Sequence, residues 1–248
     1  MRPQMKRNDR MTRNIRRRTI TASGLTLLSL AAMSSAASAG NPNDAPGQSK
    51  TVSLTAELVE LNGSGASGTV TATVRNQLIR DIQVQATGLS PDAPHAQHIH
   101  YGNDALNECP TLALDTDPMD GLINTVEGVP AYGPVVVSLT TSGDTTPASV
   151  LAVDRYPVSD DGSYSYSRSN IEFTDVSGTG YTGGTGTAKQ IADSIREGEG
   201  VVVIHGVDYN GNGVYDFGRP GEFGSGASEL NAALPREATD PAACGILR

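Results

Sequence analysis

The stretch Pro94-His95-Ala96-Gln97-His98-Ile99-His100 holds three of the four histidines of this 248-residue chain. The fourth, His205, ends the apolar run Gly200-Val201-Val202-Val203-Ile204. On a β-strand, His98 and His100 leave the same face because successive side chains alternate between the two faces. Two imidazoles on one strand and a third from a distant strand make the kind of site that copper and zinc prefer. The segment therefore predicts a strand that carries two ligands of a metal site.

The sequence around this segment has the alternating apolar and polar pattern of other short strands. Only residues 187–197 have a helical pattern, with Ile191 and Ile195 one turn apart. The glycine-rich stretches 177–186 and 211–226 are expected to be loops. The fold class that follows is an all-β Greek-key sandwich or barrel with long loops and one short helix. The expected strands are residues 51–61, 68–74, 79–86, 96–101, 134–139, 163–173, 200–205 and 243–247.

The first 39 residues have the pattern of a cleavable export signal. Eight Lys or Arg and one acid lie between Arg2 and Arg18, an apolar stretch covers 20–33, and Ala37-Ser38-Ala39 gives an A-x-A site. The apolar stretch is short for a bilayer span, although an uncleaved anchor is the alternative. Arg17-Arg18 hints at twin-arginine export, and the general export route stays open. We expect an export signal over 1–39, a linker over 40–50 and a β-domain over 51–248.

Charge narrows the range of partners. Loss of the eight basic residues and one acid of the signal would change the formal net charge from −9 to −16. Such a surface repels nucleic acid and anionic membranes, so neither is expected as a partner. It suits a secreted or extracytoplasmic protein that acts on a small molecule or on none.

The chain has two cysteines, Cys109 and Cys244. In an exported protein an even pair most simply forms a disulfide, which here would join the loop after the histidine strand to the C-terminal strand. The alternative is that a thiolate binds a metal ion, which oxidation outside the cell disfavours.

Taken together, these elements resemble the copper–zinc superoxide dismutases and, more closely, bacterial secreted proteins with CHRD-type or superoxide-dismutase-like domains. The resemblance covers most of residues 51–247. It rests on five motifs in the family's order: Gly88-Leu89-Ser90-Pro91 before the histidine strand; His95, His98 and His100 followed by Gly102-Asn103-Asp104; Cys109 nine residues later; Val202-Val203-Ile204-His205; and Ala243-Cys244-Gly245-Ile246. It implies a copper site formed by His98, His100 and His205. His95 matches a structural histidine of the family, which could be recruited as a further ligand.

The chain also departs from the family pattern. No histidine lies between Cys109 and His205, so a family-type zinc subsite and the bridging histidine are not expected. The family's steering arginine corresponds to Pro241, beside Asp240, and Arg236 is the nearest substitute. The resemblance assigns no catalytic residue beyond the metal ligands.

Two functions therefore stay open. The first is an exported copper-binding domain of the superoxide dismutase type, which would disproportionate superoxide at three histidines. The second is a non-catalytic secreted CHRD-like domain that binds copper or calcium, or serves in surface or matrix interactions. Bound copper with fast turnover would identify the first function.

Two acidic loops are candidate calcium sites. The first matches the start of a D-x-[DN]-x-[DN]-G calcium loop and has a candidate ligand set of Asp208, Asn210, Asn212 and Asp216, although Arg219 stands where such a loop has its bidentate glutamate. The second spans 115–121, with Glu127 downstream. The alternative for both is a polar turn of the Asn-Gly or Asp-Gly kind.

Overall fold

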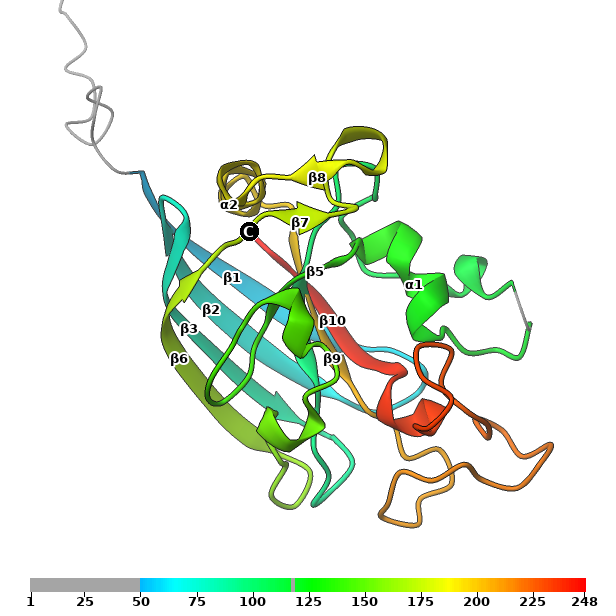
Figure 1. The fold of residues 1–248 in the computed structure, drawn as a ribbon. Coiled ribbons are helices and arrows are strands. Elements are labelled where there is room, and N and C mark those ends of the chain that lie inside the picture. Colours follow the sequence, from blue (N-terminus) through cyan, green and yellow to red (C-terminus); the bar gives the residue numbers. More distant parts are fainter. Residues whose placement is uncertain (1–49, 117–118) are drawn as a thin grey trace, which may run out of the picture. The chain divides into compact units, whose positions relative to one another are not determined.

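Eight antiparallel strands form one curled sheet in the computed structural model, which describes residues 50–116 and 119–248 (Figure 1). The strand order is β5-β4-β9-β10-β1-β2-β3-β6. A separate two-stranded ribbon pairs β7 with β8. The strands are β1 (Thr51–Glu60), β2 (Ser67–Arg75), β3 (Leu78–Thr87), β4 (Gln97–His100), β5 (Val135–Ser138), β6 (Tyr164–Glu172), β7 (Val176–Ser177), β8 (Thr185–Gly186), β9 (Gly200–His205) and β10 (Pro241–Leu247). The helices are α1 (Thr125–Tyr132) and α2 (Ala188–Arg196).

One half of the sheet is formed by β1, β2, β3 and β6. One face of this half packs on the core, and the other face is exposed to solvent. Its strands show the alternation expected of such a sheet. In β1 the buried side chains are those of Leu54, Ala56 and Leu58, with exposed residues between them. The same pattern continues through β2 and β3, so apolar side chains of three strands line the core.

The other half, formed by β5, β4, β9 and β10, is buried on both faces. All residues of β4 and β9 are buried. Ile99, Val202 and Ile204 belong to the main core, whereas Val201 and Val203 pack on the opposite side with Tyr132 and Cys244. Helix α1 and the long loops cover this outer side, which explains why these strands have continuous apolar runs.

The connections give the sheet its Greek-key character. The chain crosses from β3 to β4 and from β5 to β6, elements that are not neighbours along the sheet. Side chains of β6 then contact the segment after β5, because Tyr166 Oη and Arg168 Nη1 both donate to the Thr140 carbonyl, at 3.2 and 2.6 Å. The two edge strands of the sheet are thereby linked without a backbone ladder.

The sequence predicted the β class and all eight strands of the main sheet, with ends within a few residues. The expected helix at 187–197 is α2. The view that only this segment is helical was wrong, since Thr125–Tyr132 forms α1 in spite of Pro130. The expected loop at 177–186 is closed at its base by β7 and β8, which pair Val176 with Gly186 and Ser177 with Thr185. The expected signal and nearly all of the linker lie outside the described residues.

Within the part of the chain that the structure describes, no helix is long and apolar enough to cross a membrane.

Cys109 and Cys244 form the expected disulfide, with Cα atoms 5.7 Å apart. It joins the loop before α1 to the middle of β10, 135 residues further along the chain. The bond therefore holds the covering segments against the outer side of the sheet.

We predict that Cys109→Ser/Cys244→Ser lowers the free energy of unfolding by about 3–4 kcal/mol, because a long loop is no longer closed in the unfolded chain. Urea denaturation of the variant and the oxidised protein measures the difference. Wild-type protein unfolded in reductant is the control and should match the variant. An unchanged midpoint would contradict the prediction.

Candidate metal centre

His98 and His100 lie on the outer side of the doubly buried half-sheet, and the strand register brings His205 beside them. Gln97 pairs with Ile204 and His98 with Val203, so His205 at the end of β9 lies next to the start of β4. His205 N–H donates to the Ala96 carbonyl and continues this pairing at 2.8 Å. Three imidazoles from two neighbouring strands therefore face one small region.

The three rings converge closely. One nitrogen of each ring lies within 4.8 Å of the others. Among the described residues, this is the only group of three or more His, Cys, Asp or Glu that could hold a metal ion. Metal–imidazole bonds of about 2.0–2.1 Å allow two nitrogens to be at most about 4.2 Å apart, so small ring movements bring the set to bonding distance.

Each ring has a hydrogen-bond acceptor for its other nitrogen. His100 Nδ1 donates to the Gly133 carbonyl at 2.9 Å, and His205 Nδ1 donates to the Thr239 carbonyl at 2.6 Å. The Tyr156 hydroxyl donates to the Ser149 carbonyl, so its oxygen accepts from His98 Nε2 at 2.8 Å. These acceptors fix the tautomers and leave the lone pairs of His98 Nδ1, His100 Nε2 and His205 Nε2 free.

The three free nitrogens are buried and without a hydrogen-bond partner among the described residues. Only 2–3% of each histidine is exposed. Burial lowers the pKa of His100 to about 3 and that of His205 to about 4, and it places the pKa of His98 well below the ordinary 6.5. An unsatisfied buried polar group costs roughly 1–3 kcal/mol. Three of them, neutral and convergent, are the donor set that a metal ion requires.

The acceptor for His100 depends on a glycine at the end of α1. Gly133 has φ of +83°, and a Cβ there would lie 2.6 Å from the Gly102 nitrogen. Helix α1 begins with a capping box in which Asn124 and Glu127 exchange hydrogen bonds. The helix thus places the Gly133 carbonyl over β4, where a larger residue would not fit.

The acceptor for His205, the Thr239 carbonyl, is held in place by hydrogen bonds that Thr239 forms with α1 and with the loop before β10. The Thr239 carbonyl also accepts a hydrogen bond from Thr125 Oγ1, on the first turn of α1. Thr239 Oγ1 donates to Ser228 Oγ at 2.8 Å. The covering loop and α1 are therefore hydrogen-bonded to each other beside the three histidine rings.

His95 is not part of the convergent group. Its Nδ1 lies 2.9 Å from the His205 carbonyl and its Nε2 lies 3.0 Å from the Ser90 carbonyl. The Tyr215 hydroxyl lies 3.2 Å from Nδ1. Both ring nitrogens of His95 thus lie within hydrogen-bond distance of groups outside the convergent set, and the single N–H of the neutral ring donates to one of the two carbonyls, as in a structural histidine.

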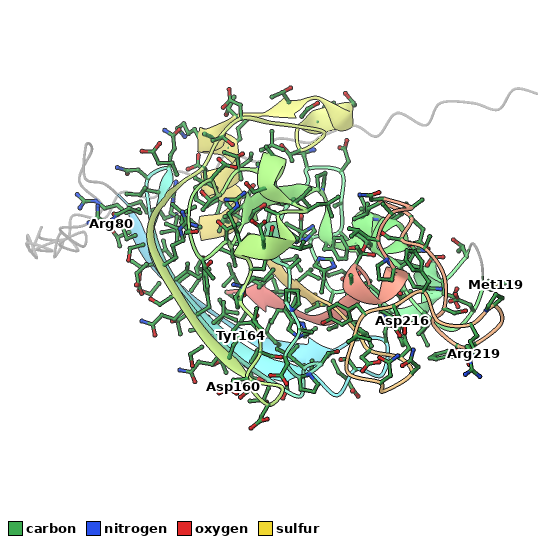
Figure 2. All side chains as sticks on the ribbon, turned by 60° about the horizontal axis from the view of Figure 1, so that its bottom comes forward. Arg80, Met119, Asp160, Tyr164, Asp216 and Arg219 are labelled. Carbon is green, nitrogen blue, oxygen red and sulfur yellow. A yellow bond between two sulfur atoms is a disulfide. The ribbon has the colours of Figure 1, made fainter. Side chains whose placement is uncertain are left out.

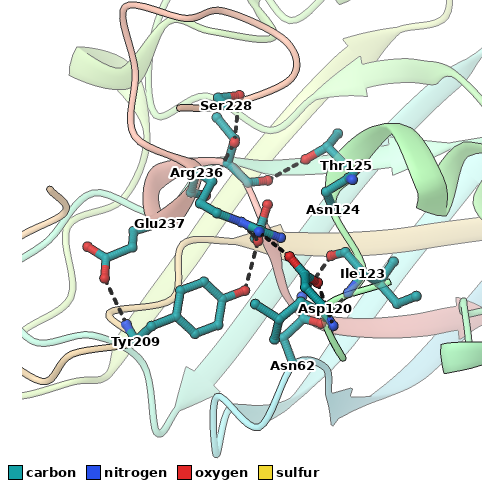
Figure 3. Close-up of polar contacts among 12 residues, drawn as sticks. Asn62, Asp120, Ile123, Asn124, Thr125, Tyr209, Ser228, Arg236 and Glu237 are labelled. Carbon is teal, nitrogen blue, oxygen red and sulfur yellow. Dashed lines mark hydrogen bonds and ion pairs between the residues drawn. The ribbon is translucent and has the colours of Figure 1, made fainter. Parts of the chain in front are cut away.

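Arg236 forms ion pairs with two aspartates. Its side chain is buried and reaches Asp120 at 2.6 Å and Asp240 at 2.9 Å (Figure 3). Tyr209 Oη also donates to Asp240, at 2.8 Å. Arg236 does not line the pocket at the three histidines. It joins the 115–121 loop to the segment before β10.

The first acidic loop lies between β9 and β10 and carries Asp216 and Arg219 at the margin of the domain (Figure 2). Asp208 accepts hydrogen bonds from the backbone N–H groups of Gly211, Asn212 and Gly213. In the second loop, Asp115 likewise accepts from the backbone of 120 and 121. The carboxylate oxygens of Asp208 and Asp115 thus stabilise turns in the two loops. Calcium binding by either loop stays a prediction.

Sequence reasoning missed the groups that orient the rings, namely Tyr156 and the carbonyls of Gly133 and Thr239. Backbone carbonyls have no sequence signature. The Asn124–Glu127 capping pattern was a usable signal for α1. For Tyr156, 58 positions from His98, we find no signal in the sequence.

No protein-family model matches the chain, and a comparison with curated proteins finds no significant match. A function can therefore be inferred only from the geometry of the three histidines, the segments that cover them and the disulfide.

We predict that the affinity of the site for Zn(II) changes by less than about threefold between pH 7 and 5. The folded-state pKa values of about 3 and 4 keep His100 and His205 free of protons in this range, and protons compete only below it. Three exposed histidines would lose more than about a thousandfold over the same range. Calorimetric titration at each pH tests this, with an exposed oligohistidine peptide as the control. A tenfold loss per pH unit would contradict it.

We predict that Tyr156→Phe weakens metal binding by about tenfold, because His98 Nε2 loses its hydroxyl acceptor. The Val150 carbonyl, 3.2 Å from the same nitrogen, limits the loss. Tyr166→Phe is the matched control, since its hydroxyl bonds to Thr140 instead. Competition with a chromophoric chelator gives both dissociation constants. An equal loss in the two variants would show that the effect is structural.

Proposed function

We propose that this chain is an exported copper-binding protein of the superoxide-dismutase-like type, with copper held by His98, His100 and His205. One observation carries the proposal: three buried imidazoles each have one nitrogen oriented by an acceptor and the other without a partner. A structural role for the histidines would leave no reason for three unsatisfied lone pairs at one point.

The donor set favours copper over zinc as the resident ion. It contains imidazole nitrogen and no thiolate, because both cysteines are in the disulfide. Imidazole suits copper, zinc and nickel, and copper has the highest affinity in the divalent series. Three protein ligands leave a coordination position open, as in catalytic sites. Copper would supply one-electron redox chemistry there.

The residues of the chain have separable tasks at this centre. The three imidazoles bind the ion, and Tyr156, Gly133 and Thr239 hold each ring in its tautomer. The covering segments exclude bulk water, because the rings are almost wholly buried. The disulfide supports an oxidising compartment for the folded protein.

Efficient dismutation requires more than a bound ion. A cation near the open position raises the local concentration of an anionic substrate. The candidate for that task, Arg236, is neutralised by two carboxylates. We therefore propose a protein that binds copper and disproportionates superoxide slowly or not at all. It would have the copper site of the first candidate function and little or none of its enzyme activity, as in the second.

The test uses the chain from Gly40 onward, loaded with Cu(II) and desalted. We expect one copper per chain, lost in His100→Ala and His205→Ala and retained in His95→Gln, a histidine outside the group. Rapid-mixing assays should give superoxide consumption at least ~10-fold below the diffusional ceiling of ~10⁸–10⁹ M⁻¹s⁻¹. Absence of copper would refute the site, and turnover near the ceiling would refute the slow dismutation.

A further inference from the structure

The free volume above the three ligating nitrogens is small. The pocket that contains His98, His100 and His205 measures about 30 Å³. A site for a single water molecule needs roughly 10–15 Å³. The space beside the rings therefore holds two or three heavy atoms, and an aromatic or sugar substrate does not fit there unless the surrounding side chains move.

The walls of this pocket are apolar. Among the described residues, no charged side chain lines it. The hydroxyls of Thr125 and Thr239, which are also at the pocket, are already hydrogen-bonded to Thr239 and Ser228. The apolar side chains are those of Val135, Val150, Leu151, Val153, Leu230 and Ala238.

The outer part of the pocket is also unfavourable for anions. Leu151 and Leu230 are 36% and 43% exposed, so they form its solvent side. Exposed Asp154 and Glu229 are the sequence neighbours of lining residues Val153 and Leu230. Arg155 does not line the pocket. Its guanidinium donates to the carbonyls of Ser142 and Asp144 and to the Ser149 hydroxyl, and the Asp144 carboxylate offsets its charge.

These features decide which small ligands can enter. An anion would lose water in an apolar passage that offers it no compensating charge, and acidic groups would repel it on approach. A neutral molecule of the same size has neither cost. We propose that the centre selects neutral ligands of two or three heavy atoms, of the chemical class of dioxygen, carbon monoxide and hydrogen peroxide, and disfavours anions of equal size.

This inference rests on the proposed copper site, and metal analysis separates the two. A sample without stoichiometric copper refutes the site itself. When copper is present, the binding rates of small probe ligands report only on how they reach the copper ion. Azide, an anion of three atoms, probes the Cu(II) form by absorbance, and carbon monoxide probes the Cu(I) form by infrared spectroscopy.

We expect the association rate of azide to rise roughly threefold between 0.01 and 0.15 M ionic strength, because salt screens repulsion. The association rate of carbon monoxide should not depend on salt. Leu230→Lys should abolish or reverse the salt dependence for azide and leave carbon monoxide unchanged. Leu230→Gln, polar and neutral, is the matched control and should behave as the wild type.

Three results would overturn the inference. The first is an azide rate in the wild type that is constant or falls with ionic strength. The second is failure of carbon monoxide to bind copper-loaded, reduced protein. The third is binding of tert-butyl isocyanide, a bulky neutral ligand of Cu(I), as tight as that of methyl isocyanide, because the pocket volume should exclude it.

Discussion

Three neutral imidazoles are buried on the outer side of one half-sheet, and the segments that cover this side meet the hydrogen-bonding needs of the rings. Each ring has one N–H group to satisfy and one lone pair. The protein satisfies the N–H groups with acceptors from three segments that are distant in sequence, ending at Gly133, Tyr156 and Thr239. Among the described residues, no group donates a hydrogen bond to the three lone pairs, so they are free to bind an ion.

That requirement explains the burial of β4 and β9 on both faces. The three acceptors can reach the rings only if α1, the segment before β6 and the segment before β10 all lie on the outer side of the sheet. The disulfide attaches the first of these regions to β10, and the Arg236 ion pairs attach it to the third. The covering layer is therefore held by strong contacts although it has little regular structure.

The sequence predicted the part of this arrangement that periodicity controls. Alternation gave the strands and the shared face of His98 and His100, and the apolar run before His205 gave a second strand. The two strands lie side by side because Gln97 pairs with Ile204, and no local sequence pattern specifies this pairing. The orienting acceptors were missed because two are backbone carbonyls and the third is one tyrosine among eight. The helix that positions Gly133 was not predicted, and Pro130 inside it is a residue that normally argues against a helix.

Binding an ion and admitting an anionic substrate are separate properties of this centre. The first needs convergent lone pairs, and the covering loops create them by excluding water and fixing tautomers. The second needs a positive charge near the open position, whereas the same loops present valine and leucine there and use Arg236 to hold themselves together. Arg236 therefore attaches the loops and does not line the pocket at the three histidines. Different residues therefore determine the two properties: the three convergent histidines determine whether an ion can bind, and the side chains at the pocket determine which small molecules can approach it.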